Sequence, residues 1–143
     1  MTRDVIIALA LAAALGGCAT AWTEDDSTQP SAAITEALRP LAGHWQGTLW
    51  ETATIYYQGQ AALDIDLGDD GGWHGTIGRA TATGTARMRH GWLVLSGTAT
   101  SPDGKQEAVY YELKGDANRR WGEVTATFAG RIEHASVSLR RTP

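Results

Sequence analysis

From Leu41 to the end of the chain, apolar and polar residues alternate with a period of two, and this pattern restricts the fold more than any other feature. In one such run the alternate apolar positions are Ala61, Leu63, Ile65 and Leu67. The intervening residues include Asp64 and Asp66, which predicts a strand with one solvent-facing side and excludes a helix. The same alternation recurs at Ala82, Gly84, Ala86 and Met88, and at Val109, Tyr111 and Leu113.

Eight segments of this kind follow one another along the chain. We expect strands near residues 44–52, 55–67, 73–78, 80–89, 92–100, 106–114, 120–129 and 131–141. Turn-forming residues separate several of them, at 68–72, 90–91, 101–104, 115–118 and 130. Eight strands joined by short hairpins can close on themselves and leave no free edge. The predicted fold class is therefore all-β, an antiparallel up-and-down eight-stranded β-barrel in residues 41–143.

The N-terminal segment is typical of bacterial targeting. Residues 5–15 contain only Val, Ile, Leu and Ala, a run too short to cross a bilayer but suited to a signal peptide. The motif Leu15-Gly16-Gly17-Cys18 resembles the bacterial lipobox. This resemblance implies that a signal peptide, residues 1–17, is cleaved between Gly17 and Cys18, and that Cys18 then carries diacylglycerol and an amide-linked acyl chain such as palmitate. The alternative is an ordinary secretory signal followed by a stray thiol.

The segment after the cysteine defines the expected location. Ala19, rather than an acidic residue, follows Cys18, and in a Gram-negative lipoprotein this implies the outer membrane, with the protein facing the periplasm. Residues 18–40 are expected to comprise the lipidated N-terminus, an acidic flexible tether and a short helix over 31–39. Cys18 is the only cysteine, so the barrel has no disulfide. The membrane is thus an expected partner through the lipid anchor.

A Gly-x-Trp motif, Gly43-His44-Trp45, follows the predicted helical turn and opens the first predicted strand. In this position it resembles the calycins, the superfamily of lipocalins and avidins. There the tryptophan closes the barrel floor, and a basic residue at the end of the last strand packs across it. The resemblance implies barrel-closing roles for Gly43, Trp45 and Arg140, or for the neighbouring Arg141, through a cation–π contact. It extends over residues 35–141 in architecture and implies no particular ligand-binding residues.

Charge argues against one class of partner. The formal net charge is −4, but from Leu41 onward the sequence contains ten Lys and Arg residues and eleven Asp and Glu residues, which nearly balance. A nearly neutral domain lacks the basic surface of a nucleic-acid binder. We therefore expect no nucleic-acid partner.

No cofactor, metal or catalytic residue is expected from the sequence. The aspartate-rich run 64–71 departs from a calcium-binding EF-hand at the fifth, sixth and twelfth positions, and a polar strand ending in a turn explains it. The four histidines, His44, His74, His90 and His134, have no short metal-ligand spacing, although a barrel can bring distant residues together. Gly-x-Ser-x-Gly and similar catalytic motifs do not occur.

The aromatic composition leaves two interpretations open. Six tryptophans and four tyrosines accompany a single phenylalanine, a set with large apolar surfaces and polar handles. In one interpretation Trp45, Trp73 and Trp121 fill the barrel, whose other inward positions are small. In the other, the small residues leave room for one small ligand.

Two functional hypotheses follow. The leading one is a membrane-anchored, non-catalytic lipoprotein that binds a small apolar or amphipathic ligand in the open end of its barrel. The alternative is a protein–protein interaction module for envelope assembly or stability, with a filled barrel and no ligand. Its docking face would consist of outward residues, namely Trp50, Tyr110, Arg87 and Arg89.

Overall fold

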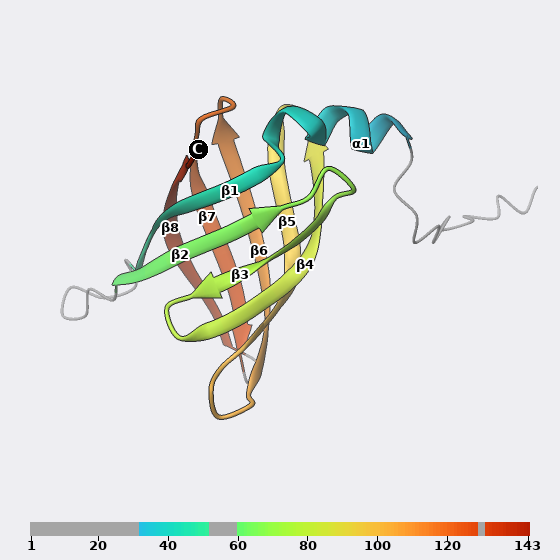
Figure 1. Ribbon diagram of the computed structural model, residues 1–143. Helices are drawn as coiled ribbons and strands as arrows, with labels where there is room; N and C mark the ends of the chain where they lie inside the picture. The colour runs from blue at the N-terminus through green and yellow to red at the C-terminus, as the bar shows by residue number, and fades with distance from the viewer. Residues whose placement is uncertain (1–31, 52–59, 129–130) are drawn as a thin grey trace, which may run out of the picture.

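A computed structural model describes residues 32–51, 60–128 and 131–143. These residues form a closed barrel of eight antiparallel strands in chain order, with the last strand pairing with the first (Figure 1). The strands are β1 (Gly43–Glu51), β2 (Gln60–Leu67), β3 (Gly72–Ile77), β4 (Ala80–Arg89), β5 (Trp92–Thr100), β6 (Gln106–Gly115), β7 (Arg119–Phe128) and β8 (Arg131–Arg141). The predicted antiparallel up-and-down eight-stranded β-barrel is confirmed.

The alternating pattern places the expected residues inside. Leu63, Ile65 and Leu67 are buried, while Asp64 and Asp66 lie on the outer face. The same holds for the inward set of β4 and for Val109, Tyr111 and Leu113 of β6. Period-two patterning therefore decided which face of each strand is buried.

Turn chemistry also agrees with the sequence. Two residues, His90 and Gly91, join β4 to β5, and both have positive φ, 50° and 83°. Two successive residues of positive φ form the hairpin turn whose twist matches that of the flanking strands. The predicted turn at residue 130, and the part of the predicted second strand before residue 60, lie outside the described residues.

A short helical cap covers one end of the barrel. Helix α1 (Ala32–Leu38) continues into the 3₁₀-helix η1 (Arg39–Leu41), as expected for a helix over 31–39, and Pro40 lies within η1. Leu38 and Leu41 are buried, and α1 packs against β4 (Figure 1). Among the described residues, no helix combines the length and the apolar composition needed to cross a membrane.

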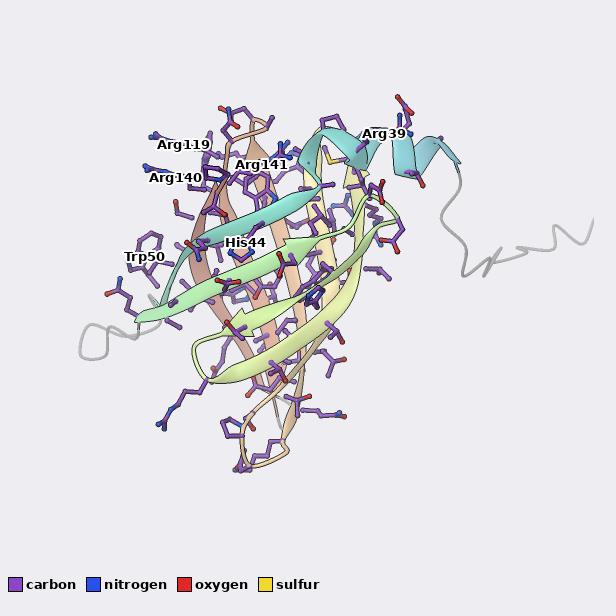
Figure 2. All side chains as sticks on the ribbon, in the orientation of Figure 1. Arg39, His44, Trp50, Arg119, Arg140 and Arg141 are labelled. Carbon is purple, nitrogen blue, oxygen red and sulfur yellow. The ribbon has the colours of Figure 1, made fainter. Side chains whose placement is uncertain are left out.

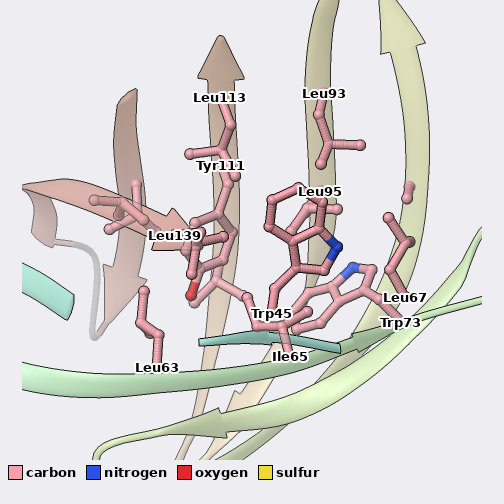
Figure 3. Close-up of a cluster of buried hydrophobic side chains, with 14 of the residues drawn as sticks. Trp45, Leu63, Ile65, Leu67, Trp73, Leu93, Leu95, Tyr111, Leu113 and Leu139 are labelled. Carbon is pink, nitrogen blue, oxygen red and sulfur yellow. The ribbon is translucent and has the colours of Figure 1, made fainter. Parts of the chain in front are cut away.

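Large side chains fill the half of the barrel under this cap. Trp45 and Trp73 are buried among leucines (Figure 3). The rings of Trp73 and Tyr111 pack edge to face, with their centres 6.1 Å apart. The glycines of β4 and β5 make room for the indole of Trp73, because a Cβ at Gly84 or Gly97 would lie 2.7 Å from that ring. Two of the three tryptophans expected inside are therefore in the core.

The interpretation that also placed Trp121 in the core is wrong for this residue. Trp121 is 46% exposed and lies on the outer face of β7. The inward set of β7 contains Gly122, Val124 and Ala126, and the same alternation turns Arg120 inward. A strand has only two faces, so the apolar pair Val124 and Ala126 outweighs the indole and leaves Trp121 outside.

Candidate functional site

The capped end brings together the residues of the Gly-x-Trp motif and the end of the last strand. The Trp45 indole N–H donates to the Leu41 carbonyl at 2.9 Å, which ties the barrel wall to η1. Trp45 lies opposite Arg141 in the β1–β8 register. The Arg141 guanidinium donates to the carbonyl of Pro40 at 3.0 Å and to that of Ala42. β8 is thus fastened to the turn that precedes β1.

Arg141, not Arg140, occupies this position. Arg140 is exposed and points away from the barrel, whereas Arg141 lies beneath the cap (Figure 2). In the described residues Arg141 makes hydrogen bonds here rather than the cation–π contact expected with Trp45. Gly43, with φ of +132°, leaves the space for it, because a Cβ there would lie 3.3 Å from the Arg141 Nε.

The opposite end of the barrel contains a cavity of about 220 Å³. The residues that line it are Leu49, Ile77, Ala80, Ala99, Glu107, Val109, Tyr111, Val124, Ala126, Glu133, His134 and Ala135. Four of them are alanines, and the two glutamates come from β6 and β8. The cavity therefore has small apolar walls and two carboxylates among its lining groups.

Tyr111 gives this cavity one unusual polar group. The side chain is fully buried, with 0% exposure, and its hydroxyl has no hydrogen-bond partner among the described residues. Burial raises the pKa of the phenol, so the hydroxyl keeps its proton. An unpaired buried hydroxyl costs free energy on the order of 1–3 kcal/mol, so a polar atom that reached it would relieve that cost.

The outer wall carries exposed aromatic side chains. Trp92 and Trp121 come from β5 and β7, and Lys114 of β6 lies between them. Lys114 is opposite Trp121 in the register, and its Nζ lies 5.9 Å from the centre of the Trp92 ring. Trp50 is also exposed, as expected, at the far end of β1 from Arg141 (Figure 2).

Two other residues of the expected docking face, Tyr110 and Arg89, are partly buried or paired with a neighbouring side chain. Tyr110 is half-buried, with its hydroxyl 3.4 Å from Glu112 Oε1. Arg89 forms an ion pair with the same carboxylate at 2.8 Å, while Arg87 is exposed. The predicted basic stripe is therefore partly neutralised by Glu112.

A polar cluster occupies the outer face of β1, β2 and β3. His44 of β1 lies opposite Asp66 of β2, which lies opposite His74 of β3. The His44 ring reaches two carboxylates, with Nδ1 2.8 Å from Asp66 Oδ1 and Nε2 3.3 Å from Asp64 Oδ2. The hydrogen bond with Asp66, together with the charge of both aspartates, raises the pKa of His44.

Sequence reasoning did not find this cluster. It found no short metal-ligand spacing among the histidines and interpreted the aspartates separately, as strand and turn residues. The partnership depends on the β1–β2 register, in which residues 22 positions apart become neighbours. The alternation of each strand shows the face but not the register.

Comparisons with known proteins add no relative. No protein-family model matches the chain, and no curated protein is significantly similar to it. The predicted cleavage and lipidation residues, Gly17 and Cys18, lie outside the described residues.

Proposed function

We propose that this chain is a membrane-anchored, non-catalytic barrel protein that binds one small apolar or amphipathic molecule in the uncapped end. The observation that carries the proposal is the cavity of about 220 Å³, one of whose lining residues is Tyr111, with a buried hydroxyl that has no partner among the described residues. The lipobox-like motif at Cys18 supports lipid anchoring, and Ala19 after it supports the outer membrane as the location, with the protein facing the periplasm.

The size of the cavity limits the ligand. An engineered apolar cavity of about 150 Å³ binds benzene, whereas pockets for drug-sized ligands have volumes of about 300–1,000 Å³. A volume of about 220 Å³ therefore suits a single ring or a short alkyl chain. This is too small for a whole phospholipid.

The lining groups suggest how such a molecule lies. Its apolar body contacts the alanine and valine walls contributed by β4 to β8. A hydroxyl or carbonyl oxygen on the buried part accepts from the Tyr111 hydroxyl and satisfies it. The ligand is thus amphipathic, with one hydrogen-bonding atom.

The first test measures what the protein retains. The full chain with Cys18→Ser, which removes the lipid acceptor, is purified and its native mass spectrum is recorded. We expect a reproducible mass excess that disappears on denaturation and identifies the cargo class. If the spectrum shows only the polypeptide mass, a direct binding test with small probes decides the proposal.

That binding test compares benzyl alcohol with toluene, which share a ring and differ in the hydroxyl group. We expect saturable binding of both, with benzyl alcohol bound more tightly. Tyr111→Phe should remove most of that preference, because the hydroxyl of the ligand loses its donor. Tyr110→Phe, which removes a hydroxyl from the outer face, is the matched control and should leave binding unchanged.

A second substitution tests the location. Ala126→Leu adds a branched side chain to the cavity wall and should abolish the binding of both probes. If wild type shows no saturable binding of either probe, or if Ala126→Leu binds them as wild type does, the cavity is not the binding site and the proposal is wrong.

One observation favours the second candidate function, docking to an envelope protein. Trp92, Lys114 and Trp121 form an exposed row across three neighbouring strands, and amphipathic aromatics are enriched at protein interfaces. Trp92→Ala with Trp121→Ala should then abolish cross-linking to a partner in the envelope while probe binding persists. The pair Trp50→Ala and Tyr110→Ala tests the face expected from the sequence in the same assay.

A further inference from the structure

We propose that the outer face of β1, β2 and β3 binds one divalent transition-metal ion of the Zn²⁺ class through His44 Nε2 and Asp64, with Asp66 orienting the His44 ring and His74 beside them. This site lies on the outside of the barrel wall and is independent of the ligand cavity. It is the one cluster of at least three His, Cys, Asp or Glu side chains in the described residues whose ligand atoms lie within 4.8 Å of one another.

Strand register brings the four side chains together. His44, Asp66 and His74 occupy one cross-strand row, and Asp64 precedes Asp66 by two residues on the same face. Directly opposed residues of antiparallel strands have Cβ atoms about 4.5–5.5 Å apart. Three neighbouring strands thus hold two imidazoles and two carboxylates at fixed positions, so a metal ion would not have to order a loop.

The distances suit an imidazole nitrogen and a carboxylate oxygen on one ion. His44 Nε2 lies 3.3 Å from Asp64 Oδ2. Two ligand atoms on a tetrahedral Zn²⁺, each about 2.1 Å from the metal, are about 3.4 Å apart. The two atoms therefore need little rearrangement to share an ion.

Asp66 orients the histidine. Its Oδ1 lies 2.8 Å from His44 Nδ1, so an N–H at Nδ1 donates to the carboxylate and Nε2 presents its lone pair toward Asp64. Metal-binding histidines commonly carry such a carboxylate on the second ring nitrogen. Asp66 Oδ2 also lies 3.6 Å from His74 Nε2, which brings a second imidazole to the site.

The carboxylates of Asp64 and Asp66 attract a cation. In the described part of the chain, the ion pairs of Asp64 and Asp66 involve only His44 and His74, with no Lys or Arg. Gln46 donates to Asp64 Oδ2 at 3.0 Å and helps to hold that carboxylate in place. Because an imidazole is a poor ligand for Ca²⁺ and Mg²⁺, the mixed nitrogen and oxygen set selects a transition metal.

The surface beside the cluster leaves space for further ligands. A broad depression there is lined by His44, Asp66, Asp70, His74 and Thr83, among others. His74 is largely exposed and can turn toward the ion without disturbing the core. Water or His74 can therefore complete the coordination.

The experiment titrates the full chain carrying Cys18→Ser, which removes the competing thiol, with ZnCl₂ in the presence of a chromophoric chelator. We expect one Zn²⁺ per chain with a dissociation constant in the micromolar range. Titration with CoCl₂ reports the coordination, because visible absorption bands of Co²⁺ should appear at the same stoichiometry.

Four substitutions locate the ion, and all four lie on the outer face. His44→Ala should abolish the stoichiometric binding, Asp64→Asn and Asp66→Asn should each weaken it at least tenfold, and His74→Ala should weaken it several-fold. The matched control His90→Asn removes an exposed imidazole from the β4–β5 turn, and Asn tolerates the positive φ found there. This control should bind as wild type does.

Two results would overturn the proposal. One is a wild-type chain that binds no Zn²⁺ at one equivalent. The other is stoichiometric binding that persists in the double variant Asp64→Asn, Asp66→Asn. Far-ultraviolet circular dichroism without metal checks that the wild type and every variant are folded. A loss of binding in a folded variant then reports on the site itself.

Discussion

The two ends of this barrel are built from the same strands with the same alternation, yet they differ in what lies inside. Under the cap, the inward positions hold large side chains, including Trp45, Trp73 and Leu113. Toward the other end the inward positions are mainly small, and a cavity of about 220 Å³ remains. Alternation therefore decides which side is inside, while side-chain size along the inner face decides whether a region becomes core or cavity.

The polar groups of the aromatic residues follow the same division. The indole N–H groups of Trp45 and Trp73 donate to the carbonyls of Leu41 and Ser96 at 2.9 and 3.2 Å. The hydroxyl of Tyr111, a residue that lines the cavity, has no such partner within the described ranges. Both indole N–H groups are thus satisfied, whereas the Tyr111 hydroxyl keeps one unmet hydrogen bond.

The largest expected effect comes from removing the central aromatic of the capped end. Trp45→Ala deletes a side chain that is 2% exposed, together with its hydrogen bond to Leu41. Large-to-small changes of this kind cost about 3–5 kcal/mol, so the free energy of unfolding should fall by that amount in urea denaturation. Trp121→Ala, which truncates an exposed indole, is the control and should cost about 1 kcal/mol or less.

Equal losses in the two tryptophan variants would remove the distinction between a packed end and an outer wall. A small loss for Trp45→Ala would mean that the cap holds without the indole.

The next prediction adds volume instead of removing it. Ala86→Leu enlarges a buried residue near the cap and should destabilise the protein by about 1–3 kcal/mol, because a packed core cannot absorb the added volume. Ala126→Leu makes the same change in the cavity wall and should alter stability by less than about 1 kcal/mol, because the space is free. Thermal unfolding of the two variants side by side measures the difference. If both variants lose the same stability, the two ends are equally well packed.

Much of this architecture could be predicted from the sequence, for a physical reason. A barrel strand alternates between two environments, so Leu63, Ile65 and Leu67 identify the inner face of β2 without any knowledge of its neighbours. The same logic failed at Trp121, where indole size suggested the core. Neighbouring residues Val124 and Ala126 fixed the face of that strand instead.

The candidate sites were less accessible to sequence reasoning. Residues such as His44 and Asp66 become neighbours only through the register between strands, which each strand's own pattern leaves open. The choice between Arg140 and Arg141 also depends on a shift of one residue, which exchanges the two faces of β8. In one interpretation the small inward residues left room for a ligand, but one of them, Gly84 of β4, accommodates the Trp73 ring.

A smaller effect is expected where the cap is fastened to the last strand. Arg141→Met keeps the length of the side chain but loses the hydrogen bonds to Pro40 and Ala42. Because Arg141 is only half-buried, we expect a loss of about 1–2 kcal/mol, with faster hydrogen exchange in η1. Arg140→Met, one residue away on the exposed face, should stay within about 0.5 kcal/mol of wild type. If Arg140→Met destabilised the protein more than Arg141→Met does, Arg140 and not Arg141 would connect β8 to the cap.

The smallest effect concerns the turn between β5 and β6, which lies at the open end and is held by local polar contacts. The Ser101 hydroxyl donates to Asp103, and the Lys105 ammonium lies 2.9 Å from the other carboxylate oxygen. The hydroxyl and then the ammonium lower the pKa of Asp103 from 3.8 to about 2. A lowered folded-state pKa stabilises the fold above the unfolded value, so this contribution is complete above about pH 4 and is lost as the pH falls toward 2.

Ser101→Ala should therefore raise the pKa of Asp103 toward its ordinary value, as followed by the carboxyl carbon shift in nuclear magnetic resonance. The capped end supplies an internal control, because Asp116 owes its lowered pKa first to the backbone N–H groups of Asn118 and Arg119. That pKa should not move in Ser101→Ala. Because Asp103 is solvent-exposed, the urea midpoint at pH 7 should hardly change. A large drop in that midpoint would show that this turn supports the whole open end, and that the capped core does not carry the stability of the barrel alone.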